Sequence, residues 1–389
     1  MNNSTNSKTK MPKIRFPHFQ DIWKPRRIDE ITYRISDPVK VDESKEYQQI
    51  GIRSHGRGIF YKPFVSGLAI GNKRVFWVKS DTFIVNIVFA WEHAVALTSK
   101  QEIGMVASHR FPMYKPNEEY LDIEFLWRLF LTKKGKYLLG LGSPGGAGRN
   151  KTLGQNTFNE LKVSIPTVPE QQKIAAFLSA VDKKIQLLQR KKELLEQYKK
   201  GVMQKIFSQE IRFKDENGND YPEWVEKKLG DITYKESSNI SANSIKGTGG
   251  NYPVYGAAGY IQNIDYYQQA GEYIAIVKDG AGVGRCVMCP PKSSVLGTLD
   301  TIHAKGNHSL GFVFRVLQQI RFQRYISGST IPHIYFKDYS KDKLGVPINE
   351  EQSKISKMIG QIDCKIQSIA DMLSMTERFK NGLLQQMFV

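Results

Sequence analysis

Few residue patterns in this chain of 389 residues could support catalysis, and each falls short of a complete motif. The glycine-rich residues 280–284 do not follow the G-x-G-x-x-G pattern of a dinucleotide site, and residues 145–152 lack the G-K-[ST] ending of a P-loop. The Asn-Pro-Pro-aromatic motif with which adenine methyltransferases hold a flipped base is absent. Histidines such as His18 and His93 and the scattered carboxylates show no grouping along the sequence that acid/base or metal chemistry needs, so paired catalytic carboxylates are neither shown nor excluded. The sequence therefore indicates no catalytic residue and no cofactor site.

Cysteine spacing leaves one metal hypothesis open. Cys286 and Cys289 form a single C-x-x-C, with His303 and His308 further along, but this spacing is unlike that of common zinc sites. Two buried thiols on a strand are the favoured interpretation, and a zinc site is the alternative. Three cysteines, the third being Cys364, cannot form a disulfide framework in so long a chain, which favours a reducing, cytoplasmic location.

The charge balance points to a polyanionic partner. The chain has 56 basic and 38 acidic side chains, a net charge of +18 and 40% apolar residues, which is ordinary for a folded protein. An excess of positive charge without membrane signals is typical of nucleic-acid binding, although solvated lysine-rich faces are the alternative. The longest apolar run, residues 83–91, is too short to cross a membrane, and the polar residues 1–13 read as a flexible tail.

Basic and amide side chains next to glycine mark candidate DNA-contact loops, because glycine lets the backbone approach a duplex closely. Any one of these loops could also be a solvated turn. The candidate DNA-binding residues in the first half of the chain are Arg53, Ser54, His55, Arg57, Lys73, Arg74, Ser108, His109, Arg110, Arg149, Asn150 and Lys151. Those in the second half are Lys278, Arg285, Ser329, Thr330, His333, Tyr335 and Lys337.

The chain also repeats itself. Residues 165–207 align without a gap on residues 346–388, at an offset of 181. Identical pairs include Glu170/Glu351 and Asp182/Asp363. A weaker similarity joins the segment that begins at Ile14 to the segment that begins at Ile211. The duplication predicts a repeated scaffold around two segments that differ from each other.

Each repeat is predicted to be a long helix with an apolar seam. In both repeats proline precedes acidic residues, which fall in the first helical turn, where the helix dipole favours them. The 4-3 spacing predicts the seam residues Ile174, Leu178, Val181, Ile185, Leu188 and Leu195 in the first repeat, and Ile355, Ile359, Ile362, Ile366, Ile369 and Leu373 in the second. An antiparallel intramolecular coiled coil buries both seams together. An amphipathic helix lying on a globular core is the alternative.

Both helices end in a similar pattern of glycine followed by paired apolar residues. Gly201 and Gly382 suggest a bend or close packing, because glycine is unfavourable inside a helix. The apolar residues that follow, represented by Val202, Phe207, Leu383 and Phe388, are candidates either for a partner interface or for packing within the chain.

The sequence thus predicts an α+β fold with pseudo-two-fold duplication, in which two irregular domains are separated by two long helices. Each domain shows one clear helix before its closing loop, at residues 122–138 and 310–326. The predicted boundaries are 1–13 for the tail, 14–165 for the first domain, 166–208 for the first helix, 209–346 for the second domain and 347–389 for the second helix. Net charge is uneven along this frame: +11 for residues 1–168, +5 for 169–208, +2 for 209–349 and zero for 350–389.

These features resemble the specificity (S) subunit of type I restriction-modification systems over essentially the whole chain. The most specific motifs are residues 163–174, the paired helix endings, residues 252–256, residues 278–284 and residues 328–332. Residues 143–146 depart from the commonest pattern, since they read Ser-Pro-Gly-Gly where the second domain has Ser329-Thr330-Ile331-Pro332.

The resemblance implies a non-catalytic, bacterial, cytoplasmic DNA reader for host defence. Each target-recognition domain would read one half of a bipartite sequence in double-stranded DNA, and the helices would set the gap. Two methyltransferase (M) subunits with S-adenosylmethionine, and two restriction subunits with ATP and magnesium, would be the partners. Two alternatives remain at this point. One is a self-contained DNA nuclease or methyltransferase. The other is a DNA-binding regulator that dimerises through the seam, whereas intramolecular pairing predicts no homo-oligomer.

Overall fold

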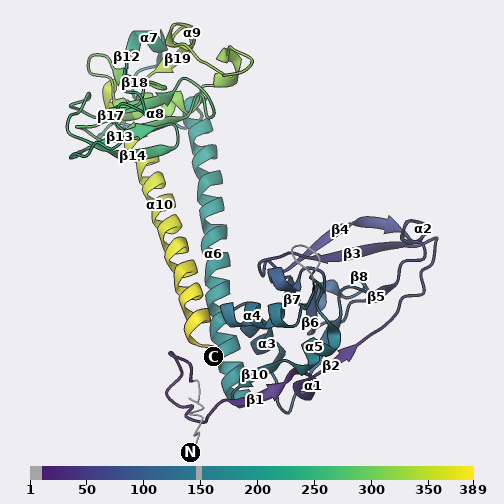
Figure 1. Ribbon diagram of the computed structural model, residues 1–389. Coiled ribbons are helices and arrows are strands. Elements are labelled where there is room, and N and C mark those ends of the chain that lie inside the picture. Colours follow the sequence, from purple (N-terminus) through teal and green to yellow (C-terminus); the bar gives the residue numbers. More distant parts are fainter. Residues whose placement is uncertain (1–10, 146–150) are drawn as a thin grey trace, which may run out of the picture. The chain divides into compact units, whose positions relative to one another are not determined.

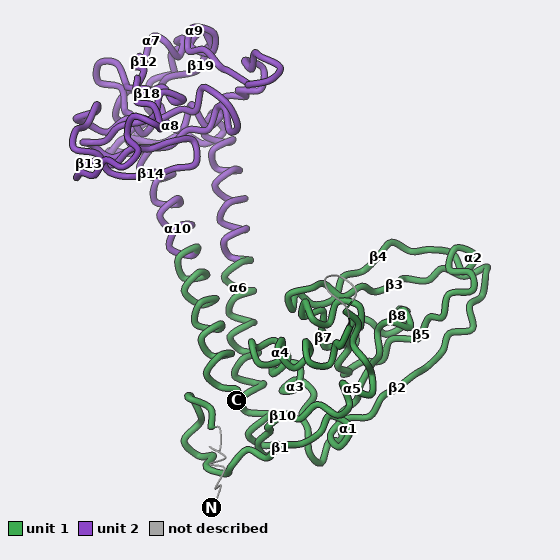
Figure 2. Tube along the Cα trace, viewed as in Figure 1, with its two compact units in different colours: residues 1–190, 370–389 green, residues 191–369 purple. Residues whose placement is uncertain are grey.

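The computed structural model of the protein describes residues 11–145 and 151–389. The chain forms two compact units, and each of its two long helices contributes to both (Figures 1 and 2). Unit 1 comprises residues 1–190 and 370–389, and unit 2 comprises residues 191–369. Each unit therefore contains one globular domain, the start of one long helix and the end of the other.

The first domain is an irregular α+β domain with two four-stranded sheets and one two-stranded sheet. The sheet orders are β2-β9-β6-β7, β4-β3-β8-β5 and β1-β10. The strands are β1 (Lys24–Arg27), β2 (Thr32–Ile35), β3 (Glu46–Ile52), β4 (Ile59–Ser66), β5 (Val75–Trp77), β6 (Phe83–Val85), β7 (Val95–Leu97), β8 (Val106–Ser108), β9 (Met113–Pro116) and β10 (Lys162–Ile165). The helices are α1 (Ile28–Ile31), α2 (Gly67–Ile70), α3 (Ile123–Phe130), α4 (Lys133–Leu141), α5 (Gln155–Glu160) and the long α6 (Val168–Phe207).

The second domain has a four-stranded, a three-stranded and a two-stranded sheet. Their orders are β12-β18-β15-β16, β14-β13-β17 and β11-β19. The strands are β11 (Val225–Lys228), β12 (Thr233–Ser237), β13 (Tyr252–Gly256), β14 (Gly259–Ile264), β15 (Tyr273–Val277), β16 (Cys286–Cys289), β17 (Ser294–Val295), β18 (Leu299–Ala304) and β19 (Lys343–Val346). The helices are α7 (Leu229–Ile232), α8 (Leu310–Leu317), α9 (Phe336–Tyr339) and the long α10 (Asn349–Gln386).

Both domains share the same entrance and exit. Each starts with a strand, a one-turn helix and a second strand, and the last strand returns antiparallel to the first before a long helix begins. The two-stranded pairs β1-β10 and β11-β19 thus connect each domain directly to α6 or α10. The strands between these edges differ in number and order, so the duplicated scaffold encloses two unlike sheets.

Two buried glutamates tie the entrance of each domain to the start of its helix. In unit 1 the Arg15 guanidinium donates two hydrogen bonds of 2.6 Å to Glu170, and the indole of Trp23 lies 3.4 Å from the same carboxylate. In unit 2, Arg212 and Trp224 bind Glu351 in the same manner, each with a nitrogen at 3.0 Å. Both glutamates lie in the first turn of a long helix, where their charge is also favoured by the helix dipole.

The glutamines that follow these glutamates, Gln171 and Gln352, bind backbone groups where each domain meets its long helix. Gln171 accepts from the Asp122 amide at 2.9 Å and donates to the Pro166 carbonyl at 2.9 Å. Gln352 accepts from the Ser309 amide at 2.9 Å and donates to the Pro347 carbonyl at 2.8 Å. Each glutamine thus links the N-cap of α3 or α8 to the proline that precedes a long helix.

A third repeated residue joins both long helices to each domain. In unit 1, Asp182 of α6 pairs with the buried Arg128 of α3 and with Lys380 of α10, whose ammonium lies 2.6 Å away. In unit 2, Asp363 of α10 pairs with Arg315 of α8 at 2.6 Å and with Lys199 of α6 at 2.7 Å. Asp182/Asp363 and Lys199/Lys380 are identical pairs of the sequence repeat, so their conservation within the chain has a structural cause.

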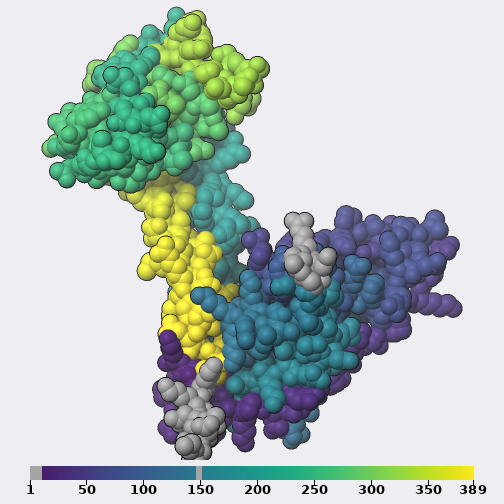
Figure 3. Space-filling model, viewed as in Figure 1, coloured from purple at the N-terminus to yellow at the C-terminus, as the bar shows by residue number. Residues whose placement is uncertain are grey.

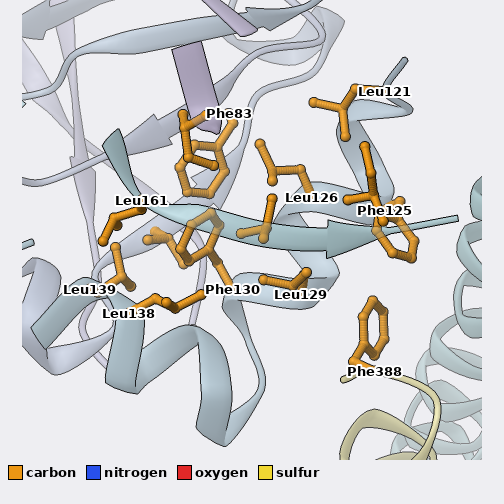
Figure 4. Close-up of a cluster of buried hydrophobic side chains, with 14 of the residues drawn as sticks. Phe83, Leu121, Phe125, Leu126, Leu129, Phe130, Leu138, Leu139, Leu161 and Phe388 are labelled. Atoms are coloured by element: carbon orange, nitrogen blue, oxygen red, sulfur yellow. The ribbon is translucent and has the colours of Figure 1, made fainter. Parts of the chain in front are cut away.

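These contacts confirm the antiparallel coiled coil. Within unit 1 the first turns of α6 share a core with the end of α10, and within unit 2 the last turns of α6 share a core with the start of α10. Figure 4 shows Phe388 facing Phe125 of α3, and the two rings lie 5.1 Å apart. The coiled coil is therefore continuous with the domain cores at both of its ends.

Three details of the sequence prediction were wrong. The predicted helix 122–138 is broken into α3 and α4, because Thr132 caps α4 by accepting a hydrogen bond from the Gly135 amide. The predicted helix 310–326 ends at Leu317, and a short 3-10 turn follows from Phe322. Gly201 and Gly382 lie inside unbroken helices; a Cβ at Gly201 would meet nothing within 4 Å and one at Gly382 only the Gln386 amide at 3.8 Å, so tight packing does not account for them.

Replacing Asp182 or Asp363 by alanine should destabilise the unit that contains it. Because each carboxylate neutralises a buried arginine but is itself partly exposed, its loss should lower the free energy of unfolding by about 3 kcal/mol, the lower end of the cost of breaking a buried pair. The effect should be larger for Asp363→Ala, since Arg128 keeps a second carboxylate partner in Glu124. Urea denaturation of the full chain measures both values.

Glu196→Ala is the matched control, because this glutamate forms an exposed pair with Lys192 within α6. Its loss should cost less than about 0.5 kcal/mol. Equal, small effects at all three positions would contradict the structural role of the repeated aspartates.

Candidate nucleic-acid interface

In the first domain, one connection organises the predicted contact loops. This connection is residues 86–94, between β6 and β7. The amides of His55 and Gly56 donate to the carbonyls of Glu92 and His93 at 2.7 and 2.9 Å. Gly56 has a positive φ, and a Cβ there would lie 2.6 Å from Leu131, so a side chain at this position is strained and crowded. The loop at residues 53–58 is thereby held against residues 92–93.

The other side of the same connection holds two more predicted loops. The Ile87 amide donates to the Arg110 carbonyl at 3.0 Å, and the Leu153 amide donates to the Ile87 carbonyl at 2.8 Å. The His109 amide donates to the Arg74 carbonyl at 3.2 Å. Backbone hydrogen bonds therefore join residues 71–74 to residues 108–110, and join residues 108–110 and 151–153 to Ile87 of the connection, although these segments are far apart in sequence.

Cationic side chains in these loops face solvent. Arg53, Arg57, Lys73, Arg74, His109 and Arg110 are exposed, and Ser54, Ser108 and Lys151 are half-buried. The Arg53 guanidinium lies over the Phe60 ring, 5.0 Å from its centroid, which fixes its direction. Arg149 and Asn150 lie outside the described residues. The sequence prediction missed Phe89, an exposed aromatic residue within the 86–94 connection that could stack on a nucleic acid.

In the second domain, the structure brings the two predicted loops together. The Gly280 amide donates to the Pro332 carbonyl at 2.9 Å, and the Ile334 amide donates to the Lys278 carbonyl at 3.0 Å. The His333 ring nitrogen Nδ1 lies 2.7 Å from the Asp279 carboxylate. Residues 278–285 and 327–337 thus form one continuous surface. Their Gly- and Ser-rich composition does not by itself predict this contact.

These loops line a cavity of about 560 Å³, termed here the Asp300 pocket. Asp300, on β18, is 4% exposed and accepts from Lys278 at 3.1 Å and from Ser237 at 2.8 Å. Lys235, on β12, lies 3.6 Å from the same carboxylate, and the sequence prediction missed it. The lining of the pocket is completed by residues from the second loop, namely His333, Ile334, Tyr335, Phe336 and Lys337.

The remaining predicted residues of the second domain are placed differently. Ser329 and Thr330 are exposed at the tip of the second loop. The Arg285 guanidinium donates to the Ala257 carbonyl at 2.9 Å, so it braces the first loop. Tyr335 is 49% exposed, and the Lys337 ammonium lies over its ring, 5.4 Å from the centroid. The pocket therefore offers cations, an aromatic face and hydrogen-bonding groups side by side.

The predicted helix residues divide into two groups. Most seam residues are buried at the coil ends and half-buried near its middle. The buried ones are Ile174, Leu178, Val181, Ile355, Ile359, Ile362 and Ile369, and the half-buried ones are Ile185, Leu188, Leu195, Ile366 and Leu373. Val202 and Phe207 pack in the core of unit 2, and Leu383 and Phe388 pack in the core of unit 1. These four residues pack within the chain, so they offer no free docking surface.

The cysteine pair lies on β16. Burial raises the pKa of Cys286 to about 12 and the pKa of Cys289 to about 11, which keeps both thiols protonated at neutral pH. Among the described residues, no group of three or more His, Cys, Asp or Glu side chains is placed to hold a metal ion. Within the same residues, no helix is long and apolar enough to span a membrane.

Two unlike domains in one repeated scaffold, each with cationic or polar loops on its surface, define a duplicated α+β protein. Comparison with known proteins agrees with this class. The family model of the type I restriction modification DNA specificity domain matches residues 23–197 and 221–374. The chain thus belongs to the type I restriction-modification specificity family, whose subunits recognise DNA and are themselves non-catalytic.

Two relatives come from Methanocaldococcus jannaschii. The type I restriction enzyme MjaIX specificity subunit is 31% identical over 37% of this chain, and the match spans only 36% of that relative's own length. The putative type I restriction enzyme MjaX specificity subunit is 24% identical over 69% of this chain and 70% of its own length.

Solved structures share the fold. The S subunit of the type I restriction-modification system from M. genitalium aligns with a TM-score of 0.65 and 16% identity, over 98% of this chain and 99% of that chain. The HsdS subunit from Thermoanaerobacter tengcongensis aligns with a TM-score of 0.50 and 17% identity, over 94% of this chain and 96% of that chain.

Replacing both Lys73 and Arg74 by alanine should weaken DNA binding and flatten its salt dependence. If both side chains meet phosphate, the slope of log affinity against log salt should fall by about 1–2. Fluorescence anisotropy over a range of salt concentrations measures this slope. Lys45→Ala is the control, since this exposed lysine pairs with Asp42, and an unchanged slope in the double variant would remove the two residues from the interface.

Thiol titration tests the interpretation of the cysteines. In the folded chain at pH 8, only the exposed Cys364 should react quickly with a disulfide reagent, because the other two thiols are kept protonated by burial. All three should react after denaturation. Fast native reaction of three thiols, or a count that rises when a chelator is added, would contradict two buried, metal-free thiols.

Proposed function

We propose that this chain is the DNA-reading and assembly subunit of a type I restriction-modification complex. Each domain reads one half of a bipartite target in double-stranded DNA, and the paired helices set the gap between the halves. The observation that carries this proposal is the repeated joint at Glu170/Glu351 and Asp182/Asp363, which supports two domains with different sheets and different loops. One scaffold with two unlike readers suits a target of two unlike half-sequences.

Assembly with catalytic partners is the second part of the proposal. Two methyltransferase subunits, which bind S-adenosylmethionine, and two restriction subunits, which use ATP and magnesium, supply the chemistry in the cytoplasm. Exposed apolar residues at equivalent positions of the two helices support a repeated docking surface. Leu194 and Tyr198 of α6 are 47% and 53% exposed, and Met375 and Phe379 of α10 are 68% and 54% exposed. Large apolar side chains grouped on a surface are typical of protein interfaces.

DNA attraction is expected to come mainly from the first half of the chain. Net charges of +11 and +5 belong to residues 1–168 and 169–208, against +2 and zero for the two later segments. Because counterion release scales with the number of phosphates that are neutralised, the first half contributes most of the salt-sensitive affinity. The second domain, with its charge-paired Asp300 pocket, contributes discrimination that depends less on salt.

Lengthening both helices should lengthen the unread gap in the target. One extra heptad inserted after Leu188 and one after Ile369 preserve both seams and add about 10 Å of helix. At about 3.4 Å per base pair, the preferred gap should grow by about three base pairs. Sequencing of methylated adenines in DNA from cells that express the variant with its partner subunits gives the gap directly.

A seven-residue Gly/Ser insertion at Gly247 is the control, since this glycine lies in an open, exposed loop of the second domain. That variant should retain the original gap. An unchanged gap in the helix variant, with methylation still present, would refute the role of the helices as a ruler.

A further inference from the structure

The repeated docking surfaces are not identical. The first groove lies in unit 1, between α6 and the end of α10, and has a volume of about 510 Å³. Phe177, Ala180, Met372, Met375 and Phe379 line it. The repeat offset of 181 assigns the equivalent residues of unit 2, which we call the second surface: Met358, Gln361, Lys191, Leu194 and Tyr198. Figure 3 shows that α10 is accessible along much of its length.

The differences change the polarity of the surface more than its size. Ala180 is replaced by the exposed Gln361, and Met372 is replaced by the exposed Lys191. At a third position, Phe379 of the first groove corresponds to Tyr198 of the second surface, which adds a hydroxyl group. The first groove therefore presents methionine and phenylalanine side chains where the second surface presents an amide, an ammonium and a phenol.

A groove between two helices with apolar side chains one turn apart fits an amphipathic helix of a protein partner. Lys184 is among the residues that line the first groove, and Lys365 is its equivalent at the second surface, so an acidic residue of the same partner would find a cation at both. Double-stranded DNA is a poor occupant, because its phosphates gain nothing from contact with Met375 or Phe379. A partner that binds twice in the same manner is what the duplicated positions require.

We infer that the two methyltransferase subunits bind with unequal affinity, the first groove being the tighter site and the one that is filled first. This inference rests on the proposed docking of methyltransferase subunits to the helices. Burying Lys191 and Gln361 under a partner removes their polar groups from water, which opposes binding at the second surface. Methionine side chains, by contrast, adapt to an apolar partner and add contact area. The chain thus forms a stable 1:1 complex before the 1:2 complex.

Titration of the full chain with its methyltransferase subunit, followed by native mass spectrometry, tests this directly. We expect two dissociation constants that differ by about tenfold or more, after correction for statistics, which corresponds to about 1.4 kcal/mol. Hydrogen exchange on the 1:1 complex should show protection around residues 372–379 before protection appears around residues 191–198.

Exchanging the two polar differences should exchange the affinities. The double variant Ala180→Gln with Met372→Lys should weaken the first site to the level of the second, and Gln361→Ala with Lys191→Met should strengthen the second site. All four positions are exposed, so both variants are expected to fold. Ile103→Lys, an exposed apolar residue of the first domain, is the matched control and should change neither constant.

The outcomes separate the inference from the proposal on which it rests. Absence of any methyltransferase binding would overturn the proposed docking itself. Two equal sites, or unequal sites that the exchanges leave unchanged, would overturn the inference while the docking proposal stands.

Discussion

The structure depends on a buried arginine that a partly exposed carboxylate neutralises, and this pair occurs twice. Asp182 and Asp363 each neutralise an arginine from a domain helix and a lysine from the opposite long helix, so one side chain holds three elements together. Burial of Arg128 and Arg315 makes this arrangement demanding, because removal of the aspartate leaves a cation with less compensation in a poorly solvated place. At the start of the same long helices, Glu170 and Glu351 each bind an arginine and a tryptophan from the first residues of their domain. The strands between entrance and exit differ in number and order between the two domains, while these contacts recur in both.

Much of the scaffold could be predicted from the sequence because it is duplicated and periodic. The seam residues and the strands around Tyr252–Gly256 and Tyr273–Val277 follow from spacing that acts locally, and the antiparallel pairing was predicted from the duplication, since two equivalent seams can be buried against each other. The break between α3 and α4 was missed, since a threonine cap competes with a continuous apolar pattern. The fate of Val202 and Leu383 was left open, because an apolar pair at a helix end is compatible with both a core and an interface. Only the packing of the domain cores distinguishes them.

The individual loops of the candidate interface could be predicted from the sequence, but the contacts that bring these loops together could not. Glycine next to a cation marks a loop, and several such loops of the first domain share backbone hydrogen bonds through residues 86–94, which no motif marked. In the second domain the decisive residue, Asp300, lies on a strand that reads as ordinary core. Its carboxylate orients Lys278 and attracts Lys235, so the pocket depends on a long-range contact that local sequence does not encode. The two halves of the chain thus share a repeated scaffold but differ in net charge.

The central claim is that one duplicated scaffold carries two independent DNA readers. The most direct test is the methylated DNA motif produced with the partner methyltransferase by the intact chain and by a chimera in which residues 229–342 are replaced by the corresponding segment of another specificity subunit. We expect the intact chain to specify two half-sequences with a fixed gap, and the chimera to change one half while the other half and the gap stay the same. A single continuous motif, or a chimera in which both halves change together, would contradict the account.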